Sequence, residues 1–199
     1  TQLLKGGERQ DTPQFQDKVI SWLPNDPDFI LVSVDADIAG ADSVYRVHVN
    51  RGRMGRIKAP MGSVNRWYAD RQDNVRASYK YDDKEQRVTY RILNNTTGDW
   101  DTVWTYKVFE EPSIEIAGFG GNPNDLYIFA DHGGRQALFK VDLVKPGYPR
   151  ELLRAHEQYD VSGQLIYSEA HKDVVGMYLN VGEERSVFWH PEFKALQAG

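Results

Sequence analysis

The chain has 199 residues, of which 40% are hydrophobic and 27% are charged, so it can bury a substantial core. Its 29 acidic and 24 basic residues give a net charge of −5, which argues against nucleic acid or an anionic membrane as the main partner. No apolar run approaches the ~20 residues of a membrane-spanning helix, and the absence of cysteine excludes disulfides and thiolate chemistry. We therefore expect a soluble part of a longer protein, from either the bacterial cytoplasm or the periplasm.

Short strands are predicted along most of the chain. In residues 43–50, Tyr45, Val47 and Val49 fall on one face, which is the period of two of a strand. The 17 glycines and 9 prolines gather mainly in turn clusters between such runs, as in a series of hairpins. No run holds a helical spacing for long, so the sequence predicts an all-β fold. In chain order, the strongest predicted strands cover residues 29–32, 43–50, 87–92, 103–108, 126–129, 137–143, 165–167 and 174–179.

A turn, a dense apolar strand and an alternating strand recur along the chain. Each copy of this unit begins with a strong apolar residue, and these are Phe29, Val75, Leu126 and Leu165. Successive copies therefore begin 46, 51 and 39 residues apart. This spacing is close to the ~40–45 residues of a four-stranded propeller blade. A β-sandwich or an open barrel is the alternative, but neither requires internal similarity. We therefore expect a partial β-propeller of about four to five four-stranded antiparallel blades, forming one fragment over residues 1–199 with approximate blades at 16–60, 61–112, 113–155 and 156–195.

Several segments resemble the non-catalytic β-propeller of the prolyl oligopeptidase family of serine peptidases, in its dipeptidyl-aminopeptidase and acylaminoacyl-peptidase branch. The resemblance implies a C-terminal α/β-hydrolase domain that carries a Gly-x-Ser-x-Gly nucleophile elbow and a Ser, Asp, His triad. It also implies that the propeller gates the access of short peptides to that domain. The segments that carry the resemblance are SWLPNDPDFILVSVD, SVYRVHVNRGRMGRI, WYADRQDNVRASY, GFGGNPNDLYIFADHGGRQALFKVDL and YDVSGQLIY.

The catalytic half of such a peptidase is absent from these 199 residues. The nearest match to the elbow, Met-Gly-Ser-Val-Asn at residues 61–65, lacks the second glycine. We therefore predict no catalytic residue and no cofactor in this chain, with a peptide substrate and the hydrolase domain as partners within a parent peptide hydrolase. The alternative is a stand-alone propeller that binds proteins or ligands, because propellers host many functions.

Four charged residues are candidate substrate contacts. The resemblance implies that a propeller glutamate pair holds the free amino terminus of a substrate, and Glu110 and Glu111 are the candidate pair. Two close carboxylates suit an ammonium group, which donates three hydrogen bonds. The family pair lies in a short helical insertion, whereas this pair ends an alternating strand, so a solvated strand end is the interpretation that we favour. Arg76 and Arg135 lie in family-like segments, where they either meet substrate or, in the interpretation that we favour, pair structurally with carboxylates.

A metal site is not predicted from the five histidines. No two histidines lie within five residues of each other, and no motif such as H-E-x-x-H is present. The five are His48, His132, His156, His171 and His190. A site would require histidines that are far apart in sequence to converge. We interpret them as histidines of turns and strand faces.

Overall fold

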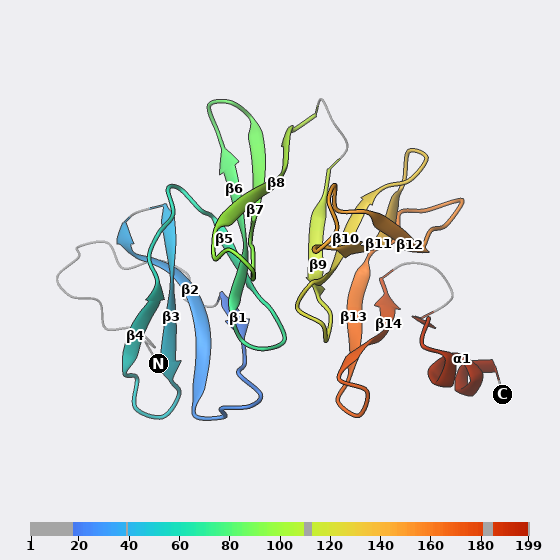
Figure 1. The fold of residues 1–199 in the computed structure, drawn as a ribbon, viewed down its shortest axis with the longest axis horizontal. Coiled ribbons are helices and arrows are strands. Elements are labelled where there is room, and N and C mark those ends of the chain that lie inside the picture. Colours follow the sequence, from blue (N-terminus) through green and yellow to red (C-terminus); the bar gives the residue numbers. More distant parts are fainter. Residues whose placement is uncertain (1–17, 39, 110–112, 181–184, 199) are drawn as a thin grey trace. The chain divides into compact units, whose positions relative to one another are not determined.

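The described part of this computed structural model comprises residues 18–38, 40–109, 113–180 and 185–198. Within it, the chain forms fifteen strands in four antiparallel sheets, together with one short helix (Figure 1). Each sheet is a meander of consecutive strands, which is the construction of a β-propeller blade. The predicted fold class is thus confirmed. The chain divides into two compact units, and residues 70–72 belong to the second unit although they lie between strands of the first.

Unit 1 contains the first two blades. In each blade the strands are hydrogen-bonded in chain order. The first blade consists of β1 (Val19–Ser21), β2 (Phe29–Ile38), β3 (Ala41–His48) and β4 (Met54–Lys58). The second consists of β5 (Arg66–Ala69), β6 (Val75–Asp82), β7 (Arg87–Leu93) and β8 (Trp100–Lys107).

Unit 2 contains the other two blades and the helix. Its second blade has three strands within the described residues, whereas four were expected of a complete blade. The first blade of unit 2 consists of β9 (Glu115–Phe119), β10 (Asp125–Asp131), β11 (Gln136–Asp142) and β12 (Arg150–Arg154). The second consists of β13 (Gly163–Ser168), β14 (Asp173–Leu179) and β15 (Ser186–Phe188), followed by α1 (Pro191–Ala198). No described helix is long and apolar enough to cross a membrane.

Strands β2 and β3 are buried on both faces. Val32 and Tyr45 belong to a cluster on one face, whereas Leu31 and Val44 pack on the other against Trp67 of the second blade. Successive strand residues point to opposite faces of the sheet. A strand with apolar residues at successive positions is therefore buried on both faces. This explains the continuous apolar run at the start of β2.

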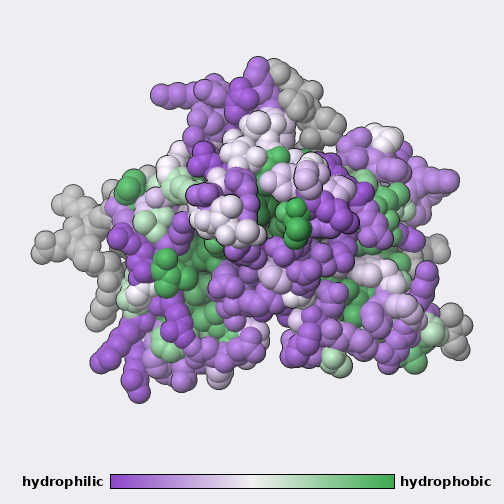
Figure 2. Space-filling model, viewed as in Figure 1, coloured by the Kyte–Doolittle hydropathy of each residue, from purple (hydrophilic) through white to green (hydrophobic). Residues whose placement is uncertain are grey.

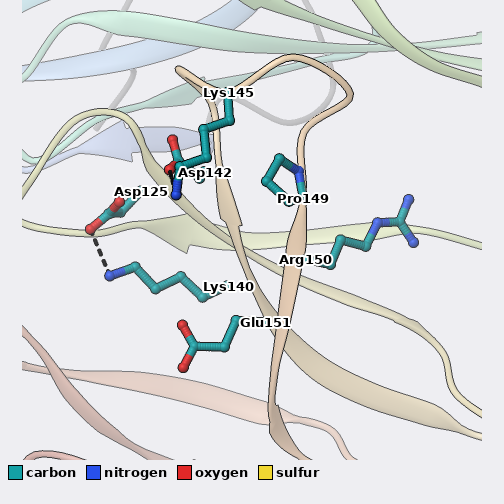
Figure 3. Close-up of a pocket in the computed structure, with 7 residues that line it drawn as sticks. All are labelled: Asp125, Lys140, Asp142, Lys145, Pro149, Arg150 and Glu151. Atoms are coloured by element: carbon teal, nitrogen blue, oxygen red, sulfur yellow. Dashed lines mark ion pairs between the residues drawn. The ribbon is translucent and has the colours of Figure 1, made fainter.

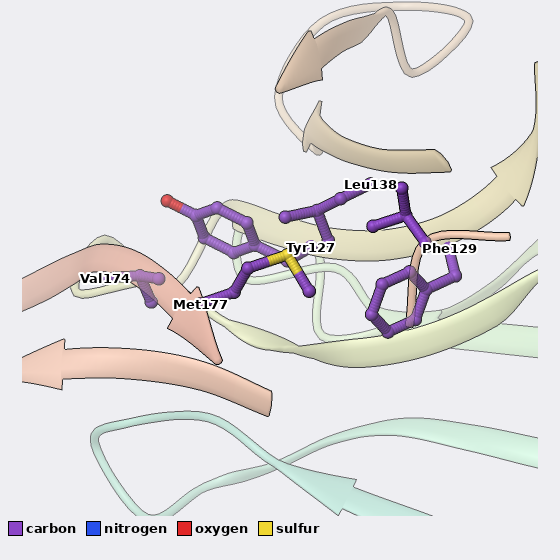
Figure 4. Packing of buried hydrophobic residues seen from close by; sticks show 6 residues of the cluster. Tyr127, Phe129, Leu138, Val174 and Met177 are labelled. Atoms are coloured by element: carbon purple, nitrogen blue, oxygen red, sulfur yellow. The ribbon is translucent and has the colours of Figure 1, made fainter. Parts of the chain in front are cut away.

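The core of unit 2 lies between its two blades. Tyr127 and Phe129 of β10 and Leu138 of β11 meet Val174 and Met177 of β14 in one buried cluster. Figure 4 shows these side chains pointing toward one another from the two sheets. Burying five such side chains contributes on the order of 10 kcal/mol of hydrophobic free energy, before the entropy of folding is subtracted. This cluster joins the two blades into one unit.

The surface is largely hydrophilic. Figure 2 shows hydrophilic residues over most of the visible face, with hydrophobic residues in small groups between them. This agrees with a mean hydropathy of −0.61. The most exposed large hydrophobic residues, Trp22, Phe109 and Leu196, are distant from one another in sequence and need no functional explanation.

A small polar cluster lies on the β2–β3 hairpin. The Ser43 hydroxyl donates a hydrogen bond to Asp37 Oδ2 at 2.5 Å, and Arg56 donates another at 3.1 Å. Hydrogen bonds from Ser43 and Tyr45 and the nearby Arg56 cation lower the pKa of Asp37. Burial, followed by the hydrogen bond to Asp37, raises the pKa of Tyr45 to about 12. The folded state therefore favours the protonated phenol.

We expect Tyr45 to make unit 1 sensitive to alkali. A pKa raised from the ordinary 10 to about 12 contributes stability that is fully present below pH 10 and is lost as the pH rises to about 12. The loss amounts to roughly 2–3 kcal/mol. The pKa values of Tyr79 and Tyr127 are also raised, so the effect must be measured as a difference from Tyr45→Phe. Urea unfolding at pH 9 and above pH 11 should show a steeper loss in the wild type, and parallel losses in both proteins would contradict this assignment.

Candidate functional site

The candidate site is a charged pocket on the blade formed by β9 to β12. Its volume is about 260 Å³. It lies where β10 and β12 begin and β11 ends, and it includes the β11–β12 loop (Figure 3). Its lining residues are Asp125, Lys140, Asp142, Lys145, Pro149, Arg150 and Glu151.

Strand register brings most of these side chains together. Asp125 lies opposite Asp142 in the β10–β11 pair, and Lys140 lies opposite Glu151 in the β11–β12 pair. Directly opposed residues point to the same face, and Lys140 and Asp142 share a face because they are two residues apart. Arg150 pairs with Val141 and so belongs to the opposite face. Accordingly, Arg150 extends away from the Asp125–Lys140 pair in Figure 3.

Two ion pairs organise the pocket. Lys140 Nζ lies 2.7 Å from Asp125 Oδ2, and both side chains are half-buried or more. Lys145 Nζ lies 3.1 Å from Asp142 Oδ2. The backbone N–H of Val144, followed by the Lys145 ammonium, lowers the pKa of Asp142. Burial lowers the pKa of the Arg150 guanidinium.

The pocket is lined almost entirely by charged groups. Two lysines and three carboxylates share it, whereas the Arg150 guanidinium extends away from them (Figure 3). Neighbouring cationic and anionic groups can bind the carboxylate and ammonium groups of a zwitterion. An amino acid or a dipeptide with both ends free has this charge pattern.

Neither of the two described candidate residues, Arg76 and Arg135, lines this pocket. Arg76 lies in β6 of unit 1 with its side chain 2% exposed, and it interacts with neighbouring groups. Arg135 is exposed in the turn before β11, where its Nε donates a hydrogen bond to the Glu157 carbonyl at 3.0 Å. Glu110 and Glu111 lie outside the described residues. Residues 61–65, which resemble a nucleophile elbow, form a loop that leads into β5.

The structure brings two of the five histidines together. His171 and His190 are 19 residues apart in sequence, yet their ring centroids are 4.4 Å apart. The other three histidines each lie beside an aromatic ring. His48 contacts Phe29, His132 contacts Phe139 and His156 stacks on Tyr159.

Sequence reasoning missed the pocket, although a signal for it is present. The alternation in residues 137–143 already places Lys140 and Asp142 on one face of a strand. Their partners Asp125 and Glu151 come from neighbouring strands, and only the strand register identifies them.

The comparisons with known proteins support the fold. No protein-family model matches the chain, and no curated protein matches it. Among solved structures, the chain is similar to TolB from Acinetobacter baumannii, with a TM-score of 0.50 at 10% sequence identity. The alignment covers 82% of this chain, and the chain spans only 38% of the TolB chain. At this identity the likeness shows the fold alone, which is a β-propeller.

Proposed function

We propose that this chain is the non-catalytic propeller part of a prolyl-oligopeptidase-like serine peptidase, where it gates the access of short peptides to a C-terminal α/β-hydrolase domain. The observation that carries the proposal is the set of four antiparallel propeller blades, one of which carries a charged pocket that offers binding groups. The assignment to a peptidase rests on the segments that resemble the prolyl oligopeptidase family.

Gating of this kind requires no chemistry from the propeller. A wall that admits an extended peptide and excludes a folded protein is sufficient to select substrates by size. Glu110 and Glu111 are the proposed contacts for a free amino terminus, because a carboxylate pair is stabilised by an ammonium group and not by an acylated nitrogen. The exposed Arg135 remains a proposed contact for the substrate. The burial of Arg76 supports structural pairing for that residue.

The test uses the full-length protein and this chain of 199 residues, in parallel. A fluorophosphonate probe should label a serine of the full-length protein outside residues 1–199 and should leave the isolated chain unlabelled. The full-length protein should hydrolyse dipeptidyl chromogenic substrates and leave a folded protein substrate intact. Labelling of a serine within residues 1–199, or an unlabelled full-length protein, would overturn the proposal.

A double substitution tests the glutamate pair in the same assay. Glu110→Gln with Glu111→Gln keeps side-chain size and removes both charges, so kcat/KM for substrates with a free amino terminus should fall about tenfold or more. N-blocked substrates should be unaffected, and Glu85→Gln, an exposed carboxylate in the β6–β7 turn, serves as the control. Equal losses on both substrate classes would exclude the pair as the amino-terminus contact.

The charged pocket favours a second candidate function, a stand-alone propeller that binds a zwitterionic ligand. Isothermal titration of the chain with a dipeptide measures this directly, and Lys145→Ala and Glu151→Gln should weaken binding if the pocket holds the ligand. The reading frame that follows residue 199 discriminates between the two functions. A Gly-x-Ser-x-Gly elbow followed by Asp and His within roughly 250 residues favours the peptidase, whereas a stop codon favours the binding module.

A further inference from the structure

Three metal-ligating side chains converge in unit 2, away from the charged pocket. His171 lies in the turn between β13 and β14, His190 directly precedes α1, and Glu192 is in the first turn of that helix. One potential ligand atom from each residue lies within 4.8 Å of the others. The strongest contact joins His171 Nε2 to Glu192 Oε2 at 2.8 Å.

Backbone contacts hold the His190 segment against β14. The backbone N–H groups of Trp189 and His190 both donate to the Val175 carbonyl, at 3.1 and 3.2 Å. Trp189 Nε1 donates to the Val174 carbonyl at 3.1 Å. The first helical hydrogen bond runs from the Lys194 N–H to the His190 carbonyl, so His190 is the N-cap residue of α1. His190 is therefore placed by the fold and not by a freely moving tail.

Aromatic packing orients the two imidazole rings. Phe193 contacts the His171 ring at 5.4 Å and the His190 ring at 5.7 Å between centroids, and it stacks on Phe188. On the other side of the His171 ring, Nδ1 lies 2.9 Å from the Ser168 hydroxyl, which also accepts a hydrogen bond from the His171 backbone N–H at 3.3 Å. An outer partner on one ring nitrogen leaves the other directed at a metal, which is the usual arrangement around metal-binding histidines. Here Nε2 is the nitrogen directed at Glu192.

His190 adds a second, independent indication of a ligand. Its Nδ1 atom is buried and makes no hydrogen bond with the described residues. A buried polar atom without a partner loses its hydrogen bonds to water, so such atoms are rare in folded proteins unless another group satisfies them. Within this cluster, a cation is one group that could supply the missing interaction.

From this geometry we infer that His171, His190 and Glu192 form a binding site for a late divalent transition-metal ion such as Zn²⁺. Two imidazoles and one carboxylate are ligands that zinc accepts, whereas Mg²⁺ and Ca²⁺ prefer sites made of oxygen atoms. Ligand atoms at zinc distances of 2.0–2.1 Å lie roughly 3.3 Å apart in a tetrahedron. The 2.8 Å contact between His171 and Glu192 therefore has to open by about half an ångström to admit the ion.

The metal would link the β13–β14 turn to the C-terminal helix. His171 belongs to the turn, whereas His190 and Glu192 belong to the segment that begins α1. One ion would therefore link the two directly, in addition to the ring contacts, the His171–Glu192 pair and the hydrogen bonds to Val174 and Val175. Binding to the folded state alone stabilises that state by mass action. Without a metal, the 2.8 Å contact between His171 and Glu192 is a simple side-chain pair, which is the competing interpretation.

The test uses the untagged chain after removal of metal with a chelator. Isothermal titration with ZnCl₂ should show one saturable site, excess zinc should raise the Tm, and Co²⁺ should give the visible absorption of a tetrahedral nitrogen and oxygen site. His171→Ala, His190→Ala and Glu192→Gln should each weaken zinc binding by at least about tenfold, and Ser168→Ala should weaken it by about tenfold through the orientation of His171. His132→Ala is the matched control, because His132 lies in another exposed turn of the same unit.

The outcomes separate the metal site from the ion pair. Glu192→Gln keeps the shape of the side chain, so it preserves folding better than the alanine variants and still removes a ligand. If zinc binds the wild type and the ligand variants equally, or if no saturable site is found, the proposal is overturned. Loss of Tm in Glu192→Gln to the same extent with and without zinc would assign the cluster to an ion pair. Because these measurements follow zinc binding and not peptide cleavage, failure of the metal site leaves the proposed peptidase function unaffected.

Discussion

Replacing Trp67 with alanine should lower the free energy of unfolding of unit 1 by about 3–5 kcal/mol. Trp67 is 1% exposed and packs in a cluster with Leu31 and Val44 of the first blade. Its Nε1 donates a hydrogen bond to the Asp42 carbonyl at 2.7 Å, and its ring meets the edge of Trp100 at 5.4 Å. Because Trp67 belongs to the second blade, its removal opens a cavity between the two blades of unit 1.

Urea unfolding followed by circular dichroism measures this loss. Trp22→Ala is the matched control, since Trp22 is 73% exposed and its removal should change stability by no more than about 0.5 kcal/mol. Trp67→Phe should lie between the two variants, because it keeps an aromatic ring and loses the hydrogen bond to Asp42. A Trp67→Ala protein as stable as Trp22→Ala would show that this contact between blades is not needed for stability.

Substituting alanine for Gly121 should destabilise unit 2 by about 3 kcal/mol. A Cβ atom at this position would lie 1.7 Å from the Lys172 carbonyl oxygen and 2.8 Å from its carbon. Both are backbone atoms, so no side-chain rotation relieves the clash. The Gly121 N–H donates to Asp173 Oδ1 at 2.9 Å, and its carbonyl accepts a hydrogen bond from Gln72 Nε2 at 2.8 Å, so both contacts are at risk when the loop shifts.

Gly55 in β4 provides the control for this substitution. A Cβ atom at Gly55 meets nothing within 4 Å, and its backbone is not in the left-handed region. Gly55→Ala should therefore be neutral or slightly stabilising, by up to about 1 kcal/mol. Thermal unfolding and amide hydrogen exchange should locate the loss of Gly121→Ala in β9 to β14. An unchanged Tm in Gly121→Ala would show that the loop at residue 121 can move away from the Lys172 carbonyl with little loss of stability.

Local periodicity predicted most of the inner strands but only some of the outer ones, namely β8 at residues 103–108 and β13 at residues 165–167. The alternating run at residues 87–92 is β7 (Arg87–Leu93), and the dense run at residues 126–129 lies within β10. The run at residues 137–143 corresponds closely to β11. In contrast, β4 and β12 are mostly exposed, so their sequences carry no apolar alternation and were not recognised.

The helix α1 was missed for a related reason. It has only eight residues and a weak apolar face, so it gives no helical period in the sequence. Its start does carry a local signal, because Pro191 occupies the first helical position and Glu192 lies in the first turn. That signal is too short to identify a helix without the packing of Phe193 on Phe188.

The sequence by itself determined the all-β class and the repeated blade, because hydrophobic period and turn residues act over a few neighbouring positions. The tertiary structure alone decided which charged side chains share the pocket, since Asp125, Lys140 and Glu151 come from three strands whose register depends on long-range pairing. It likewise decided that His171 and His190 lie side by side, although nothing in their spacing indicates it. A site built from separate segments follows from how the elements pack, and that information is distributed over the whole core rather than carried by the residues of the site.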